Sequence, residues 1–308
     1  MEFFHPDKLK INFTKAFKIC KWISIAMLIA GVIAFFKPGP NYGIDFKGGI
    51  QIEAEFPGVK VDDGKLREIL SSVIEGFSIQ TAMEGNITRY LITSNTEEKE
   101  SVSTLVNQTL TKNFGATSPK TWQIVKVDTV GPKIASNLSK AALLSIIYVC
   151  LLITIYMYWR FDWRYAPGAI ACIFHDLIIT VGILCIAQVE FSTSIIAALL
   201  TLAGYSINDT VVVFDRVREM EQKLLGKSRV AVVNQALKSC FGRTVVTSLT
   251  TLFSCMALYF FGGKGLQSFS LTLLFGILIG TYSSIYIACP LYLWACEKFG
   301  ESGQLQNA

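Results

Sequence analysis

Six long apolar segments constrain this 308-residue chain more than any other feature. A helix that crosses about 30 Å of hydrocarbon needs roughly 20 apolar residues. Segments of this kind occur at residues 17–36, 138–158, 166–187, 192–214, 244–262 and 267–291. Hydrophobic residues make up 52% of the chain and charged residues only 17%, a composition too apolar for an ordinary soluble domain. The sequence therefore predicts an α-helical membrane protein with six transmembrane helices.

The distribution of Lys and Arg predicts the orientation of these helices. The first apolar segment lacks a small-residue cleavage site, so we expect it to remain as a membrane helix and not to be removed as a signal peptide. Five lysines lie in or beside the N-terminal segment, and six basic residues lie in the loop 215–242, whereas the turn 188–191 has none. Basic loops stay on the cytoplasmic side. We therefore expect residues 1–16, the loop 215–242 and the tail 292–308 to be cytoplasmic.

Residues 37–137, between the first two apolar segments, have the composition of a small soluble domain on the outer side. The stretch GGIQIEAEF alternates apolar and polar residues, which is the pattern of a half-buried strand. Helical spacing follows at Leu66 and Leu70 and again at Val102 and Val106, with two short strands between them, and TWQIVKV forms a last strand. The order βαββαβ predicts an α+β domain of the ferredoxin-like kind. Its open sheet face either binds a polypeptide or another domain, or is plain solvated surface.

The sequence GYSINDTVVVFDR, residues 204–216, places polar residues inside an apolar segment. A charged side chain at the centre of a membrane helix costs about 2.5 to 3.5 kcal/mol on insertion scales. Asp209 therefore requires a partner, an aqueous cavity or a bound proton. Helical spacing puts Tyr205, Asn208 and Asp209 on one face, and Ser206 lies beside it. The alternative is that Asp209 serves only as an interhelical hydrogen bond that joins helices.

Two further segments carry polar faces. In the third apolar segment, small and polar residues repeat every four positions at Gly168, Cys172, Asp176 and Thr180, with His175 beside them. Arg243 opens a row that continues with Thr247, Thr250 and Ser254. We expect the polar faces to meet inside the helix bundle, where Asp209 and Arg243 pair and Asp176 assists. The alternatives are that Arg243 anchors its helix at the membrane surface and that His175 is a packing residue and not a proton carrier.

Rows of small residues predict where helices contact one another. One row is formed by Thr272, Gly276, Gly280 and Ser284, and another by Ala26, Ala30 and Ala34. Within the loop 215–242, residues 217–241 have the pattern of amphipathic helix lying on the membrane surface, with a turn at Gly226.

Several chemistries are not expected. No G-x-x-x-x-G-K-[ST] motif occurs, so we expect no direct use of ATP. The eight cysteines lack the spacing of a zinc site, and none lies between residues 37 and 137, so we expect neither a metal cofactor nor a disulfide in the outer domain. The net charge of +5 lies mostly in the basic flanks of the helices, which does not indicate a nucleic-acid partner.

Several motifs together resemble the SecF subunits of the SecD/SecF family of protein-export membrane proteins, within the resistance-nodulation-division superfamily. They are YGIDFKGG, VGP, RFDWRYA, FHDLIIT, GYSINDTVVVFDR, RTVVTSLTT and GTYSSIYIA, and they cover nearly all of the chain. The resemblance implies a bacterial inner-membrane protein with a periplasmic ferredoxin-like domain. It also implies that Asp209 and Arg243 belong to an ion pathway, to which we add Asp176, Asn208, Ser206, Tyr205 and His175.

The resemblance further implies a transport subunit and not an enzyme. Its expected partners are SecD, the SecYEG channel, the translocating unfolded polypeptide and membrane lipid, and its expected coupling ion is a proton or a sodium ion, with no bound cofactor. Two other functions stay open at this point. The chain could be a passive scaffold that docks SecD and holds emerging polypeptide, or a small-molecule exporter of the same superfamily.

Overall fold

The structure is a computed structural model that describes residues 11–57, 61–71, 77–84, 87–94, 99–115 and 121–299. The outer parts of the two predicted cytoplasmic ends, residues 1–10 and 300–308, lie outside the described residues. The chain divides into two compact units. The helix unit comprises Met1–Asn41 and Ala142–Ala308, and the α/β unit comprises Tyr42–Ala141.

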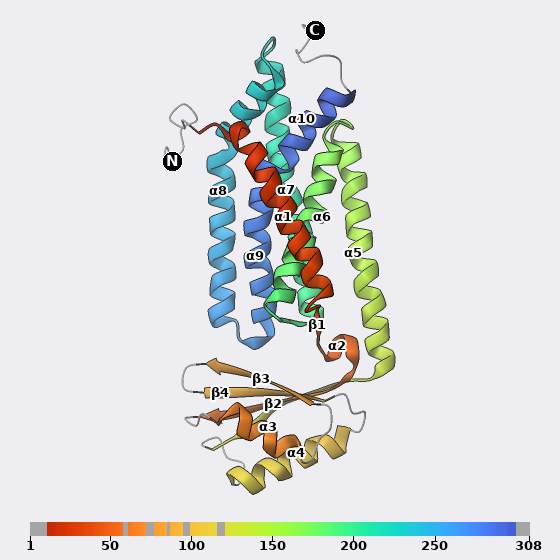
Figure 1. Cartoon of the computed structure of the whole chain (residues 1–308), viewed down its shortest axis with the longest axis vertical. Coiled ribbons are helices and arrows are strands. Elements are labelled where there is room, and N and C mark those ends of the chain that lie inside the picture. The colour runs from red at the N-terminus through yellow and green to blue at the C-terminus, as the bar shows by residue number, and fades with distance from the viewer. Residues whose placement is uncertain are drawn as a thin grey trace. The chain divides into compact units, whose positions relative to one another are not determined.

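Among the described residues, six helical segments are long and apolar enough to cross a membrane, which confirms the predicted number. Five are single helices, and the sixth is interrupted at Ile287 (Figure 1). The five are α1 (Phe13–Phe36), α5 (Pro132–Arg160), α6 (Ala166–Ile186), α7 (Thr193–Lys223) and α8 (Arg229–Phe261). The sixth consists of α9 (Lys264–Tyr286) and α10 (Ala288–Phe299).

The helical pattern and the turn at Gly226 that were predicted within residues 217–241 are confirmed, but the apolar residues of this stretch pack against protein and not on a membrane surface. Helices α7 and α8 both extend beyond the predicted spans and meet at a short turn, in which Gly226 has a positive φ of 80°. The apolar residues Val232, Val233 and Leu237 are buried in the same cluster as Phe214. Packing them against protein removes their apolar surface from solvent, which is why this stretch prolongs the helices instead of lying on a membrane surface.

Small residues bring helices of the helix unit close together, at positions that the sequence predicts only in part. A Cβ atom added to Gly276 would lie 2.5 Å from Leu202 Cδ2, so the predicted contact row on α9 packs against α7. On α1, Ala26 and Ala30 are exposed, so the predicted alanine row is wrong at these positions. Gly31 faces α6 instead, because a Cβ atom added to Gly182 would lie 2.4 Å from Gly31 Cα.

The α/β unit is built on a four-stranded antiparallel sheet with the strand order β3-β4-β2-β5. The strands are β2 (Gly49–Pro57), β3 (Phe77–Glu84), β4 (Ile87–Ser94) and β5 (Gln123–Val130). Helix α3 (Asp63–Ser71) follows β2, and helix α4 (Lys99–Phe114) follows β4. A single-turn helix, α2 (Ile44–Lys47), precedes β2, and the short strand β1 (Asn41–Tyr42) pairs with β6 (Glu190–Phe191).

Helices α3 and α4 lie on one face of this sheet (Figure 1). Alternate residues of β2, such as Ile52 and Phe56, are buried in one core with Leu66 of α3 and Val106 of α4. Trp122 belongs to the same core, and its indole donates a hydrogen bond of 2.9 Å to the carbonyl oxygen of Gly115. The core of the α/β unit therefore consists of residues from that unit alone.

Candidate functional site

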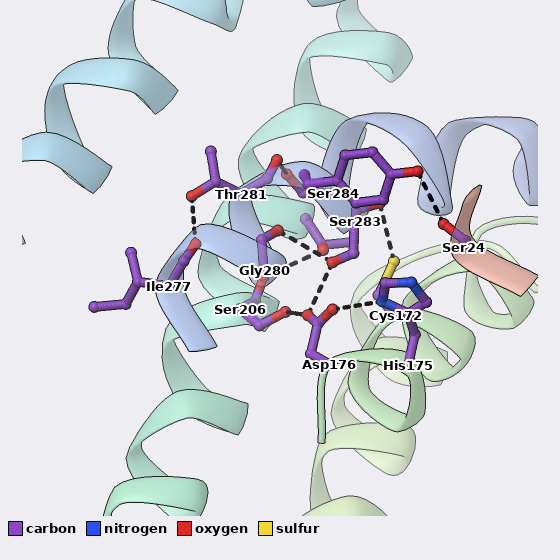
Figure 2. Close-up of polar contacts among 12 residues, drawn as sticks. Ser24, Cys172, His175, Asp176, Ser206, Ile277, Gly280, Thr281, Ser283 and Ser284 are labelled. Atoms are coloured by element: carbon purple, nitrogen blue, oxygen red, sulfur yellow. Dashed lines mark hydrogen bonds and ion pairs between the residues drawn. The ribbon is translucent and has the colours of Figure 1, made fainter. Parts of the chain in front are cut away.

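Asp176 of α6 is the centre of a buried polar cluster in the helix unit (Figure 2). Only 1% of its surface is exposed. Its Oδ2 atom accepts hydrogen bonds of 2.5 Å from the Ser206 hydroxyl of α7 and of 2.8 Å from the Ser283 hydroxyl of α9. Its Oδ1 atom lies 2.9 Å from Nδ1 of His175. One carboxylate thus joins three helices through polar contacts.

Small residues make room for this cluster. The four-residue row on α6, from Gly168 to Thr180, is buried as the sequence predicts. Opposite it, Gly280 of α9 presents no side chain, and a Cβ atom there would lie 3.5 Å from Asp176 Oδ2 and 3.3 Å from Ser206 Cβ. Ser283 follows Gly280 by three residues and therefore lies on nearly the same helix face. The predicted packing residues Gly276 and Gly280 hence lie where α9 approaches α7, and Gly280 also borders the carboxylate.

His175 is buried beside Asp176, with 3% of its surface exposed. Its Nε2 atom makes no hydrogen bond to any described residue. Its ring stacks on that of Tyr282 at a centroid distance of 6.2 Å and an interplanar angle of 26°. The Tyr282 hydroxyl in turn donates a 2.8 Å hydrogen bond to the carbonyl oxygen of Cys20 and lies 3.0 Å from the Ser24 hydroxyl, both in α1. The imidazole therefore lies between a carboxylate and a phenol.

Asp209 of α7 has a different environment from that of Asp176. It is also buried, with 4% of its surface exposed, but its Oδ2 atom accepts no hydrogen bond in the described part of the chain. The expected ion pair with Arg243 is absent there, because Arg243 is on the exposed side of α8 and acts on Asp209 only by longer-range attraction. Thr244 and Ser248 are the buried polar residues of α8 instead.

The three predicted polar faces therefore meet only in part. Asp176, His175 and Ser206 come together, and Asp209 lies three residues beyond Ser206 on the same helix. Tyr205 is half-buried, with a hydroxyl that finds no partner among the described residues, and Asn208 is exposed. On α8, Thr250 and Ser254 are exposed and donate to carbonyl oxygens of their own helix. The row that begins at Arg243 thus faces away from the interior.

Three residues of the polar cluster were not predicted as site residues: Ser24, Tyr282 and Ser283. Ser283 and Tyr282 belong to the motif GTYSSIYIA, and Ser283 follows the predicted packing residue Gly280 by one helical turn. That spacing is a signal that sequence reasoning could have used. Nothing comparable marks Ser24, a lone serine in an apolar helix.

Comparison with known proteins identifies the family. The C-terminal domain of the protein export membrane proteins SecD and SecF matches residues 99–298, and the SecD/SecF GG motif matches residues 33–56. The protein translocase subunit SecF of Rickettsia typhi is 34% identical over 97% of this chain and 96% of its own length. The chain belongs to the SecD/SecF protein-export family. The SecF subunit of Desulfurispirillum indicum is 35% identical over 91% of this chain and 90% of its own length.

Two solved SecDF structures have a similar fold. SecDF of Thermus thermophilus, described as a translocon-associated membrane protein, matches with a TM-score of 0.83 and 31% identity over 93% of this chain. SecDF in its super-membrane-facing form matches with a TM-score of 0.68 and 32% identity over 94% of this chain. This SecD/SecF family member spans 39% of the length of either SecDF chain. These matches and the six apolar helices support an auxiliary role in the Sec translocase and a multi-pass protein of the inner membrane.

Proposed function

We propose that this chain is an auxiliary subunit of the bacterial Sec translocase that pairs with SecD and uses the transmembrane ion gradient. In this proposal the coupling ion is a proton, and the gradient promotes the export of unfolded polypeptide that leaves the SecYEG channel. Membership of the SecD/SecF family supports the role in the translocase. The likeness to SecDF chains, of whose length this chain covers 39%, supports the pairing with SecD. The orientation, with both termini in the cytoplasm, rests on the distribution of Lys and Arg.

The observation that carries this proposal is the state of Asp209. A buried carboxylate with a partnerless oxygen is unfavourable when charged, since the bilayer interior offers little water to solvate it. Such a group binds a proton readily and loses it when water or a cation comes close. Arg243 is the cation within electrostatic reach. Asp209 therefore has the chemistry of a group that alternates between protonated and charged.

A second membrane subunit accounts for the exposed polar residues. The side chains of Asn208 in α7 and Arg243 in α8 make no hydrogen bond or ion pair to any described residue, although both lie in spanning helices. Polar groups in such helices are stabilised when they face protein or water and not lipid tails. SecD covering this side would enclose Asp209, Asn208 and Arg243 between the two subunits. Membrane lipid would cover the remaining apolar surface, such as that of α5.

The cycle then couples proton movement to the outer domain. We assign the α/β unit to the ferredoxin-like arrangement and to the periplasm, where emerging polypeptide is found. Moving one charge through the membrane potential releases about 2.3 kcal/mol per 100 mV. One or two protons in each transport cycle are therefore enough to change the free-energy difference between two conformations by several kcal/mol. Gain and loss of a proton by Asp209, which lies within electrostatic reach of Arg243, is the switch in this cycle.

The test is the variant Asp209→Asn in proteoliposomes that contain SecD and SecYEG. Asparagine keeps the shape of the side chain but cannot alternate in charge, so we expect the gradient-dependent stimulation of export to be abolished while the complex still assembles. Export is measured with and without an imposed proton gradient, and then with a sodium gradient. Asp215→Asn is the matched control, because that carboxylate is on the same helix and pairs with Arg160, the last residue of α5.

The outcomes separate the proposal from its rivals. Undiminished response to the gradient in Asp209→Asn vesicles contradicts the proton cycle and favours a passive scaffold. A small-molecule exporter would instead change the drug susceptibility of a deletion strain while protein export stayed normal. The proposal requires the opposite pattern, in which export fails and drug susceptibility is unchanged.

A further inference from the structure

The polar cluster around Asp176 reaches the N-terminal helix α1 through two residues, Tyr282 and Ser24. The Tyr282 hydroxyl donates a hydrogen bond of 2.8 Å to the carbonyl oxygen of Cys20. The phenol oxygen of Tyr282 can therefore accept a hydrogen bond from the Ser24 hydroxyl, which lies 3.0 Å away. Figure 2 shows the contact between α9 and Ser24 of α1. Ser24 is 2% exposed, and it is the one buried polar residue in the described part of α1.

The remaining inward contacts of α1 are of a different kind. Toward the C-terminal end of α1, Gly31 touches Gly182 of α6 backbone to backbone. At its start, the backbone N–H of Phe13 donates to Asn234 of α8 at 3.0 Å. Close apolar contacts hold a helix but respond little to a change of charge. The contact of Tyr282 with Cys20 and Ser24 is the polar contact of α1 that lies next to the Asp176 cluster.

The His175 ring joins this contact to the carboxylate. One side of the imidazole is bound through Nδ1 to Asp176, and its face lies on the Tyr282 ring. The buried Nε2 atom has no partner among the described residues, so no further hydrogen bond fixes the ring in place. When the charge on Asp176 changes, the hydrogen bond to Nδ1 changes in strength, since charge-assisted hydrogen bonds are roughly twice as strong as neutral ones. The ring and the tyrosine stacked on it are then free to shift.

We propose that Tyr282 and Ser24 are positioning residues that transmit the charge state of Asp176 to helix α1. Asp176 acts on His175, His175 acts on the Tyr282 ring, and the Tyr282 hydroxyl holds α1 at Cys20 and Ser24. The chain runs from the end of α1 at Phe36 into the α/β unit at residue 42, so the covalent connection carries a shift of α1 to the start of that unit. The inference rests on the proposed function for its purpose, because ion-driven export needs a mechanical link from the membrane interior to the outer domain.

A distance measurement on the full chain tests the link without any export assay. Spin labels at Ile29 of α1 and Leu278 of α9, both exposed, report the separation of these helices after the eight cysteines have been replaced. We expect Asp176→Asn, which removes the charge, to change the distance distribution. The same substitution should have no effect on the distribution when Tyr282→Phe is present, because the hydroxyl that holds α1 is gone.

Two controls make this experiment specific. Tyr286→Phe removes a phenol hydroxyl four residues away that makes no hydrogen bond to a described residue, and its ring lies 5.2 Å from that of Tyr282. The response to Asp176→Asn should survive in that background. Ser24→Ala should weaken the response, and Ser24→Thr, which keeps a hydroxyl, should restore it. Melting temperatures of all variants should agree within a few degrees.

A functional readout distinguishes this inference from the function on which it rests. In the export assay, Tyr282→Phe should lower the gradient-dependent stimulation of export at least fivefold. Full stimulation with Tyr282→Phe, or an unchanged distance response to Asp176→Asn in its presence, overturns the inference and leaves the role of Asp209 standing. Loss of stimulation in Asp215→Asn as well as in Asp209→Asn would count against the proposed function instead.

Discussion

At the scale of single residues, two buried carboxylates in this protein have opposite environments. Asp176 accepts two serine hydroxyls and contacts an imidazole, whereas one oxygen of Asp209 has no partner in the described part of the chain. A buried carboxylate oxygen without a donor is costly to keep charged, because nothing replaces the water it has lost. The two carboxylates therefore differ in their surroundings: Asp176 is in contact with polar groups of α6, α7 and α9, whereas one oxygen of Asp209 is left without a donor.

The hydrogen bond from Ser206 should contribute measurably to stability. Ser206→Ala removes one of the two hydroxyls that donate to Asp176 Oδ2. Because the acceptor is a buried carboxylate, we expect a loss of about 1.5 to 3 kcal/mol in the free energy of unfolding. Unfolding in a mixed detergent series measures it. Ser254→Ala is the control, since this exposed hydroxyl donates only to a carbonyl oxygen of its own helix. It should lower the free energy of unfolding by less than about 0.5 kcal/mol, as surface substitutions usually do. Equal losses in the two variants would contradict this account.

At the scale of elements, glycines determine how closely the helices approach. Gly182 of α6 touches the backbone of Gly31, which cannot move aside, while Gly276 of α9 touches only the end of the Leu202 side chain, which can rotate. Gly204 of α7 has nothing within 4 Å of its missing Cβ atom. The same substitution should therefore have three different effects at these positions.

We expect Gly182→Ala to destabilise the helix unit by about 1 to 3 kcal/mol, the usual range for overpacking. Gly276→Ala should destabilise it less than Gly182→Ala does. Gly204→Ala should be neutral or stabilising by up to about 1 kcal/mol, because alanine is the better helix former. The same detergent unfolding measures all three. If Gly204→Ala proved as harmful as Gly182→Ala, the close contact of α1 with α6 would not explain the effect.

At the scale of the whole molecule, the two units have separate cores. The buried cluster of the helix unit and that of the α/β unit share no residue. A core that is complete within one unit can unfold without the other. The α/β unit has about 100 residues, so its expected stability is of the order of 5 to 15 kcal/mol.

Trp122→Ala should therefore unfold the α/β unit selectively. Trp122 is fully buried, stacks on Phe56 and donates to Gly115, and truncation of such a residue costs about 3 to 5 kcal/mol. Limited proteolysis should cleave residues 42–141 while α6, α7 and α9 stay protected and the helical circular dichroism is retained. Trp163→Ala, at an exposed tryptophan of the helix unit, should leave the protein resistant. Cleavage throughout the chain in Trp122→Ala would argue against independent cores.

The orientation can be tested by labelling with a membrane-impermeant thiol reagent. In a chain without its native cysteines, a cysteine at the exposed Thr111 should react in intact spheroplasts, because the α/β unit is expected on the outer side. A cysteine at the exposed Lys227, in the turn between α7 and α8, should react only after the membrane is made permeable. The reverse pattern would place both termini outside.

Local patterns determined the elements of this protein. Apolar length alone predicts the six membrane helices, because each must bury its own backbone polar groups in lipid. The alternation along β2, read from GGIQIEAEF, predicts which of its residues enter the core, as Ile52 and Phe56 do. Repeats of four residues likewise predict that Gly168, Cys172, Asp176 and Thr180 are buried on one face of α6.

Tertiary structure decided which faces meet. The sequence places polar residues on α6, α7 and α8, but it does not say that Ser283 of α9 reaches Asp176 or that Arg243 is exposed. Those contacts depend on the rotation of each helix about its axis, which is set by the summed packing of its neighbours. The glycine pair Gly31 and Gly182 illustrates this, since neither residue has a partner until the two helices lie side by side. A local pattern is fixed by covalent neighbours, whereas a helix contact is fixed by residues far apart in the chain.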